Sequence, residues 1–506
     1  MAIKKILWYG DAPLPGVLDS FHRRGFELIR DAKDDQIVDV VLANTTAVVL
    51  SHTNDTIDQI LAGYRYLPTF INHGIRVIIL VPQMDDNGRI RKGQLAQLDA
   101  SFPWNDVVLF LADLKLTNFD NIVAAPQVPR WHPCLIKPIG NFESIGSDGE
   151  LLIRRAFPRA EEVRVSELSR GFTGSRVFMA HEKRLESSIA HWTQPKLIKI
   201  GLRLDVEQEV GNMRAVSPFV PFELRPNLEA HIAGFEKSIL IADFVDKSEP
   251  LIDVARAGRA ETAISNLFNR TLHTWRERAW SCGMSTESLA DAAERLQIVS
   301  PEKICDDYLQ SPDIQAKRVD ITALWSALKK IQFPHRAASI HADLHGDNVR
   351  VRGDDAILID LGSVKGKGEP GLGAPLSFDV AMLEIALVFT CERGENKADN
   401  GFYQTRWEKE IRHYYELKAI LSTPVRESVP EPESWMFGCI QRLRAFGIYD
   451  QSDRREYAIA LAIAMLRWCK FKPLGYGADK GRRVVALAIA AELIAEICAA
   501  PSGTYG

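Results

Sequence analysis

The sequence is poor in cysteine and contains no long apolar run. Seven cysteines are scattered over 506 residues without a Cys-x-x-Cys pair, which argues against structural zinc and for a reducing compartment, the cytoplasm. No uninterrupted apolar run reaches the roughly 20 residues that a membrane-spanning helix needs, so we expect no membrane partner. The apolar run near Met1 is too short for a signal peptide.

The sequence also lacks an excess of charge of either sign. Lysine and arginine number 62 against 66 aspartates and glutamates, which gives a net charge of −4. This balance provides no strong attraction to nucleic acid or to an anionic surface, and we expect neither as a partner. With 46% hydrophobic and 25% charged residues, the chain has the composition of a globular protein of two to four domains.

Residues 1–125 are predicted to form a doubly wound α/β domain. Continuous apolar runs, of the kind buried on both faces of a parallel sheet, occur at residues 5–9, 47–50, 76–81 and 106–111. A helix-like segment at 16–24 ends at Gly25. Apolar strands that alternate with helices are typical of this fold class.

This segment, roughly residues 3–125, resembles a response-regulator receiver domain, which is flavodoxin-like. Its phosphorylation chemistry would be lost. Asp11 alone remains of the acidic pair after the first strand, Ser51 stands in place of the phosphoacceptor Asp, and Val81 replaces a Thr or Ser. The resemblance implies a pseudo-receiver used for self-association or for docking a protein partner. The alternative is a small flavodoxin-like domain with no sensing role. Residues 126–149, rich in Pro, Gly and Ser, are predicted to be a partly extended linker.

The most informative motif is a short polar loop followed by an apolar strand. His341, Asp343 and Asn348 lie within residues 339–349, and Asp360 ends the apolar run that follows. Phosphoryl transfer needs one Asp to accept the proton of the attacking hydroxyl, and an Asn and a second Asp to hold Mg²⁺ against the phosphates. The loop and the strand supply these three groups in that order.

This combination resembles the aminoglycoside phosphotransferase and choline kinase group of the protein-kinase-like superfamily. The resemblance implies an α+β bilobal kinase-like domain, with an N-lobe at 150–248 and a helical C-lobe at 249–506. It implies Asp343 as catalytic base and Asn348 and Asp360 as Mg²⁺ ligands, with ATP as the phosphoryl donor.

Two more residues are expected to serve this loop. His341 is predicted either to take part in catalysis or to support the loop by hydrogen-bonding backbone. Asp379 follows the Gly-rich stretch 362–375, and Ser377 before it is a plausible helix N-cap. The resemblance implies that Asp379 braces the catalytic loop without taking part in the chemistry.

Upstream, a glycine-containing turn lies between two predicted strands, at residues 162–168 and 177–180. Gly171, Gly174 and Ser175 are candidate phosphate contacts, because glycine lets backbone N–H groups approach phosphate oxygens. The alternative is an ordinary hairpin turn without a ligand.

The next strand carries a lysine within an apolar run, where a charge requires a partner or a ligand. Lys199 is predicted to hold the α/β-phosphates of ATP and to pair with Glu209 on the following acidic helix, with Glu207 as the second choice. The alternative is a strand-edge cation beside a solvated glutamate. The candidate adenine-binding hinge comprises Asp243, Phe244 and Val245.

Together these features predict an ATP- and Mg²⁺-dependent phosphotransferase that acts on a hydroxyl of a small molecule or a protein. The approach to the glycine turn, residues 154–165, is similar to kinase-like domains of bacterial signalling and phage-conflict systems. Two alternatives stay open: a catalytically silent nucleotide-binding scaffold that acts through a partner, and a nucleotidyl transferase.

Overall fold

The structure is a computed structural model. It describes residues 4–10, 15–32, 42, 44–51, 66–81, 107–111, 133–140, 144–170, 175–186, 189–281, 284–366, 373–390, 400–422, 434–472 and 477–500. The chain forms two compact units, one of residues 1–210 with 227–244 and the other of residues 211–226 with 245–506. These units differ from the predicted domains in that the first combines residues 1–125 with most of the predicted N-lobe.

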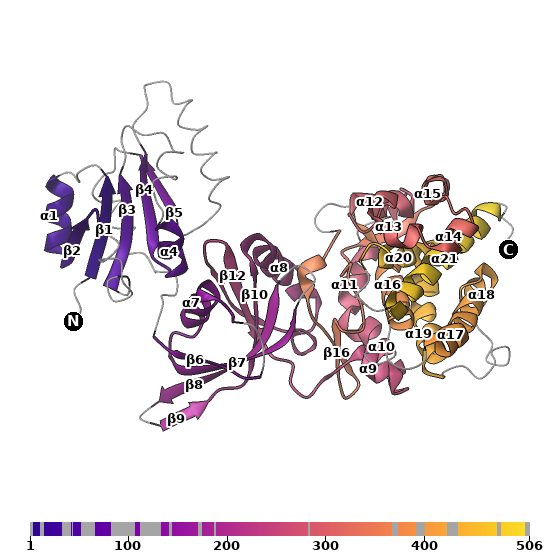
Figure 1. The fold of residues 1–506 in the computed structure, drawn as a ribbon, viewed down its shortest axis with the longest axis horizontal. Coiled ribbons are helices and arrows are strands. Elements are labelled where there is room, and N and C mark those ends of the chain that lie inside the picture. Colours follow the sequence, from indigo (N-terminus) through magenta and orange to yellow (C-terminus); the bar gives the residue numbers. More distant parts are fainter. Residues whose placement is uncertain are drawn as a thin grey trace, which may run out of the picture. The chain divides into compact units, whose positions relative to one another are not determined.

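The first unit begins with a five-stranded parallel sheet in the order β2-β1-β3-β4-β5 (Figure 1). This is the strand order of flavodoxin-like folds. Its elements are β1 (Lys4–Gly10), α1 (Pro15–Arg23), β2 (Phe26–Arg30), β3 (Thr45–Ser51), α4 (Leu67–Asn72), β4 (Arg76–Val81) and β5 (Val107–Leu111). The predicted strands are confirmed, and β2 is an addition to them.

Alternate residues of the central strands enter cores on opposite faces of this sheet. Leu7 and Val48 belong to one buried cluster, whereas Ile6 and Val49 belong to the other. Both faces are therefore covered, which explains why the sequence shows continuous apolar runs instead of alternation. Ser51 ends β3, at the position predicted from the receiver resemblance.

The first unit also contains a mainly antiparallel sheet in the order β11-β12-β10-β8-β7-β6, with β9 beside β8. Its elements are β6 (Leu135–Pro138), α7 (Ser147–Ala156), β7 (Ala160–Arg170), β8 (Arg176–Glu186), β9 (Ile189–Trp192), β10 (Lys196–Leu202), α8 (Arg203–Val216), β11 (Leu228–Ala233) and β12 (Lys237–Asp243). Leu152 and Ile153 of α7 pack with Val163 and Phe178 in the core of this sheet. The predicted linker contributes to the sheet, because β6 pairs in parallel with β7 and α7 begins at Ser147.

The second unit is mainly helical and contains two small three-stranded sheets. Its strands are β13 (Glu249–Pro250), β14 (Met284–Ser285), β15 (His335–Ala338), β16 (Val349–Arg352), β17 (Asp355–Leu358) and β18 (Ala374–Pro375). Its helices include α9 (Leu251–Arg256), α10 (Glu261–Asn266), α11 (His273–Ser281), α12 (Leu289–Arg295), α15 (Ile321–Lys329), α16 (Ser377–Phe389), α17 (Asn400–Tyr414), α18 (Leu417–Leu421), α19 (Ser434–Asp450), α20 (Glu456–Trp468) and α21 (Gly477–Ala499).

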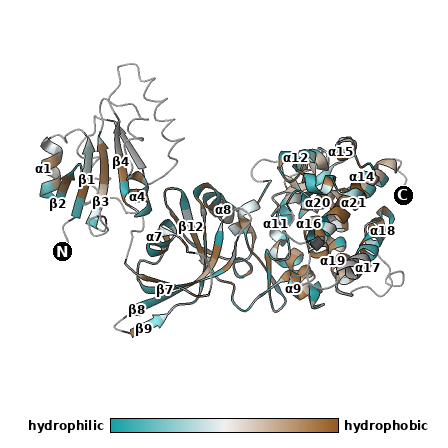
Figure 2. Ribbon diagram, viewed as in Figure 1, coloured by the Kyte–Doolittle hydropathy of each residue, from teal (hydrophilic) through white to brown (hydrophobic). Residues whose placement is uncertain are grey.

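Helix α16 forms the centre of this unit. All of its residues are buried, and it packs against α19 and α20. Brown stretches in Figure 2 mark the apolar residues of these helices. Within the described parts of the chain, no helix is both long and apolar enough to cross a membrane.

Candidate active site

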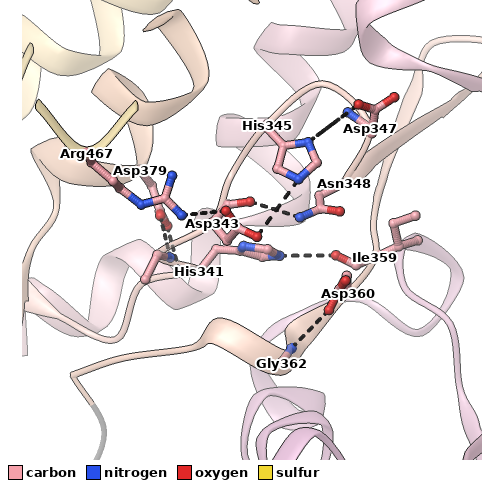
Figure 3. Close-up of polar contacts among 11 residues, drawn as sticks. His341, Asp343, His345, Asp347, Asn348, Ile359, Asp360, Gly362, Asp379 and Arg467 are labelled. Carbon is pink, nitrogen blue, oxygen red and sulfur yellow. Dashed lines mark hydrogen bonds and ion pairs between the residues drawn. The ribbon is translucent and has the colours of Figure 1, made fainter. Parts of the chain in front are cut away.

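The predicted catalytic loop joins β15 to β16 and is held by Asp379 of α16 (Figure 3). Asp379 of α16 accepts hydrogen bonds from the backbone N–H groups of His341 and Ala342, at 2.8 and 2.9 Å. Ala342 has φ = 61°, a left-handed conformation that costs a non-glycine residue about 1 kcal/mol. The Asp379 contacts stabilise the loop in that conformation. Burial raises the pKa of the Asp379 carboxyl. Ser377 does not cap the helix, because it lies inside its first turn and Leu376 holds the cap position.

His341 has the contacts of a supporting residue. Its side chain is fully buried, and Nε2 hydrogen-bonds the carbonyl of Ile359 at 3.1 Å. That bond ties the catalytic loop to the segment that precedes Asp360. A fully buried ring cannot reach an acceptor that arrives from solvent, so the geometry favours the supporting role over the catalytic one.

Asp343 is the partly exposed carboxylate of the loop. Asn348 donates from Nδ2 to the backbone carbonyl of Asp343 at 2.9 Å, which fixes the amide and directs its Oδ1 elsewhere. Arg467, from α20, pairs with Asp343 Oδ1 at 2.5 Å. His345 lies 3.9 Å from the other carboxylate oxygen, and burial lowers the pKa of its imidazole. Arg467 and His345 therefore position the Asp343 carboxylate, the candidate base, from two sides.

Asp360 follows β17 in a left-handed conformation, with φ = 55°. Its Oδ1 accepts from the N–H of Gly362 at 3.3 Å. Asn212 of α8 donates to the carbonyls of Leu361 and Gly362, at 2.8 and 2.9 Å, and so fixes the segment after Asp360.

Asn348 and Asp360 could serve as the metal ligands predicted from the sequence. An amide oxygen and a carboxylate oxygen suit Mg²⁺, which typically takes one or two carboxylates and completes its shell with waters and substrate phosphates. Among the described residues no group of three or more His, Cys, Asp or Glu side chains is arranged to hold a metal ion. Asn348 and Asp360 by themselves would leave most of a Mg²⁺ shell to waters and phosphates.

In the first unit, Lys199 of β10 pairs with Glu209 of α8 at 2.7 Å. The lysine and glutamate side chains are only 13% and 8% exposed, so the pair is largely shielded from water. Glu207, the second choice from the sequence, instead pairs with Arg203 at 2.8 Å. Of the two glutamates predicted to pair with Lys199, Glu209 is therefore the one that does so in the structure.

The other predicted nucleotide contacts are only partly described. Ser175 is buried against Gly201 of β10, where a Cβ would lie 2.2 Å from its Oγ. Gly171 and Gly174 lie outside the described residues. Asp243 engages Lys196 at 3.5 Å and Asn227 at 3.2 Å, so its side chain is committed to neighbouring protein groups. Phe244 and Val245 follow β12 directly.

Sequence reasoning missed Arg467 entirely. It lies 124 residues from Asp343, in the last turn of an apolar helix, and no motif surrounds it. Only the packing of α20 in the folded chain brings it to the loop.

Comparison with known proteins adds little to this geometry. No protein-family model and no curated protein matches the chain. Among solved structures, it is similar to an aminoglycoside phosphotransferase from Streptomyces rimosus ATCC10970, solved alone and in complex with ADP and streptomycin. Each of these is 14% identical with a TM-score of 0.28, covering 58% of this chain and 96% of the other. A putative fructosamine-3-kinase from Haemophilus somnus 129PT is 10% identical with a TM-score of 0.29, covering 66% and 90%. Because these identities and TM-scores are low, the similarities do not establish a function. The function must be inferred from the side chains of this chain.

Proposed function

We propose that this protein is a kinase-like enzyme that transfers the γ-phosphoryl group of ATP to a hydroxyl acceptor in a Mg²⁺-dependent reaction. Asp343 accepts the proton of the acceptor hydroxyl as its oxygen forms a bond to phosphorus and the bond to ADP breaks. Residues 1–125 serve as a pseudo-receiver that binds a protein partner or a second copy of the chain.

One observation carries the proposal. The loop that holds Asp343 is fixed at both ends of its short span, by Asp379 through two backbone N–H groups and by Asn348 through the Asp343 carbonyl. Phosphoryl transfer depends on placing groups rather than on covalent chemistry, so a rigid, partly exposed carboxylate beside oxygen ligands is the feature the reaction needs.

Asn348 and Asp360 would hold Mg²⁺, which neutralises charge on the phosphates during transfer. Lys199 would bind the α/β-phosphates, with Glu209 fixing the position of its ammonium. Backbone groups of Phe244 and Val245 would contact adenine. These assignments are proposals that follow from residue type and position.

Transfer from γ-labelled ATP, with Mg²⁺, to the protein and small-molecule fractions of a cell extract tests the function. Wild type should label one fraction, and Asp343→Asn should lower the rate by about 10²–10⁴-fold while ATP still binds. Asp354→Asn, an exposed aspartate in the β16–β17 turn, is the matched control and should retain the wild-type rate.

Two results would favour the alternatives. Binding of ATP without any label transfer would indicate a nucleotide-binding scaffold. A product that gains the mass of AMP instead of one phosphoryl group would indicate nucleotidyl transfer.

A further inference from the structure

Four cationic side chains lie near one another and near Asp343: three of them act electrostatically on the fourth, Lys470, as does Asp343. We call them the basic cluster: Lys303, Lys365, Arg467 and Lys470. Figure 3 shows Arg467 and Asn348 approaching Asp343 from different sides. Arg467 thus contacts the proposed base from a different side than Asn348.

Arg467 and Lys470 are held in place by the protein. Both lie 5.4 Å from the centre of the Phe471 ring, a cation–π distance. Lys470 also donates to the carbonyl of Ile298 at 3.0 Å. These contacts fix two positive charges close to each other, an arrangement that costs free energy unless something compensates it.

The other two members of the basic cluster, Lys365 and Lys303, both act electrostatically on Lys470. The backbone of Lys365 exchanges two 3.0 Å hydrogen bonds with Ile340, which precedes His341 in the catalytic loop. Lys303 ends the 3₁₀ helix Pro301–Lys303. Burial and then Arg467, Lys303 and Lys365 lower the pKa of Lys470 to about 8, and Asp343 acts in the opposite direction.

Asp343 and Glu302 offset part of this charge. Asp343 pairs with Arg467 and also acts on Lys470, and Glu302 acts on Lys303. Two carboxylates thus face four cations, and Asp343 must also accept a proton in the proposed reaction. A carboxylate or phosphate group from outside the chain would supply the missing negative charge, since arginine and lysine together bind such groups through charge-assisted hydrogen bonds.

We propose that the acceptor is a small anionic molecule that carries a carboxylate or phosphate near the hydroxyl to be phosphorylated, and that the basic cluster binds that group. The inference rests on the proposed function and names its substrate class. Binding the anion at Arg467 and Lys470 directs the acceptor hydroxyl to Asp343, which takes its proton as the new O–P bond forms and ADP leaves.

The test divides a small-molecule cell extract by anion exchange before the reaction, then adds γ-labelled ATP, Mg²⁺ and enzyme to each part. Asp343-dependent label should appear in the anion-retained part. Treating that part with a phosphatase, later removed, separates the two sources: loss of acceptor activity identifies a phosphate monoester, and its survival identifies a carboxylate.

Variants of the basic cluster provide a second measurement. Lys470→Gln should raise KM for the retained acceptor about tenfold or more and leave KM for ATP within twofold, whereas Lys470→Arg should restore the acceptor KM. Lys472→Gln, an exposed lysine two residues later, should have no effect.

Label in the unretained part or in the protein fraction would overturn the inference and leave the kinase proposal intact. So would a Lys470→Gln variant that changes only KM for ATP, because the basic cluster would then serve the nucleotide. Absence of Asp343-dependent label in every fraction would refute the proposed function and this inference with it.

Discussion

At the scale of single residues, the Lys199–Glu209 pair depends most on its surroundings. Its 2.7 Å contact is largely shielded from water, so each charge relies on the other. Removing one partner takes this ion pair away from a charge in a poorly hydrated position. The proposed role of Lys199 in binding phosphate requires its ammonium to stay where Glu209 holds it.

We therefore predict that Glu209→Gln raises KM for ATP by about 10–100-fold, equivalent to roughly 1–3 kcal/mol of lost binding. Glu207→Gln is the matched control on the same helix, because Glu207 pairs with Arg203 instead. Titration of both variants with ATP checks this. Equal effects at the two positions would mean that the helix, not the ion pair, determines nucleotide binding.

The site residues differ in how far the sequence could predict them. Asp343, Asn348 and Asp360 lie in one short stretch, so their order alone suggested a shared role. The choice of Glu209 over Glu207 was correct, but helical spacing does not decide between residues two apart. Arg467 could not be predicted, since nothing local marks a cation whose partner is 124 residues away.

At the scale of elements, a buried polar cluster joins three helices of the second unit. Arg444 of α19 pairs with Glu384 of α16 at 3.0 Å, and both side chains are at most 2% exposed. Tyr457 of α20 donates to the same carboxylate at 2.7 Å. Arg444 also donates to the carbonyl of Tyr414 at 2.9 Å, which satisfies more of its N–H groups.

Arg444→Met should destabilise the second unit by about 3–5 kcal/mol, because it leaves the Glu384 carboxylate buried without its cation. The double variant Arg444→Met with Glu384→Leu should cost less than the single one, since no unpaired charge remains. Urea unfolding of the three proteins measures this. A double variant whose cost equals or exceeds that of Arg444→Met would contradict it.

The N-terminal turn of α20 contains a second buried acid. Glu456 is 1% exposed and accepts from the N–H of Ser452 at 2.9 Å. Burial raises the pKa of Glu456 from its ordinary 4.5 to about 7. Because the folded state holds this proton more tightly than the unfolded state, the group costs no stability below pH 4.5. As pH rises from 4.5 to 7, the unfolded state loses this proton before the folded state does, so the free energy of unfolding falls. Above pH 7 both states are ionised, and Glu456 lowers the free energy of unfolding no further.

Glu456→Gln should consequently be nearly neutral at pH 4.5 and stabilising at pH 8, by up to about 3 kcal/mol. Glutamine keeps the oxygen that accepts from Ser452 and removes the ionisation. Urea unfolding at both pH values provides the measurement, with exposed Glu416→Gln as control. A stability difference that does not change with pH would show that Glu456 titrates normally.

Strands that are buried on both faces could be predicted from the sequence. Apolar runs at residues 47–50 and 76–81 gave β3 and β4 because both faces of the sheet are covered. Strands with mixed exposure were missed: β2 is only half-buried, and β6 is largely exposed at the edge of its sheet. Their stability comes from pairing with β1 and β7, which no local pattern reveals.

At the scale of the molecule, the parallel sheet domain is joined to the antiparallel sheet within the first unit. Asn72, the last residue of α4, donates to Asp148 of α7 at 3.0 Å and accepts from the N–H of Phe235 at 2.8 Å. Phe235 packs against the core of the parallel sheet domain. This end of α4 is therefore occupied by contacts inside the chain and is not a surface for docking a partner.

A buried arginine completes the joint. Arg155 of α7 is fully buried and donates to the carbonyls of Ile71, Asn72 and Ala233 at 3.0, 3.2 and 2.8 Å. The neighbouring Gly234 carbonyl accepts from Arg203, the first residue of α8, at 2.6 Å. Contacts thus run without interruption from α4 through the β11–β12 turn to the helix that carries Glu209.

We predict that Asn72→Ala loosens both sides of this joint at once. The variant removes the hydrogen bonds from Asn72 to the Asp148 carboxylate and from the Phe235 N–H to Asn72, at a cost of about 1–3 kcal/mol. Amide hydrogen exchange should then accelerate by up to about 100-fold in residues 66–75 and in residues 228–243 together. His73→Ala is the control: Nδ1 of that histidine hydrogen-bonds the Thr69 carbonyl within α4 at 2.7 Å, so faster exchange should stay in residues 66–75. Exchange that changes on one side alone in Asn72→Ala would show that the two sheets do not depend on each other through this contact.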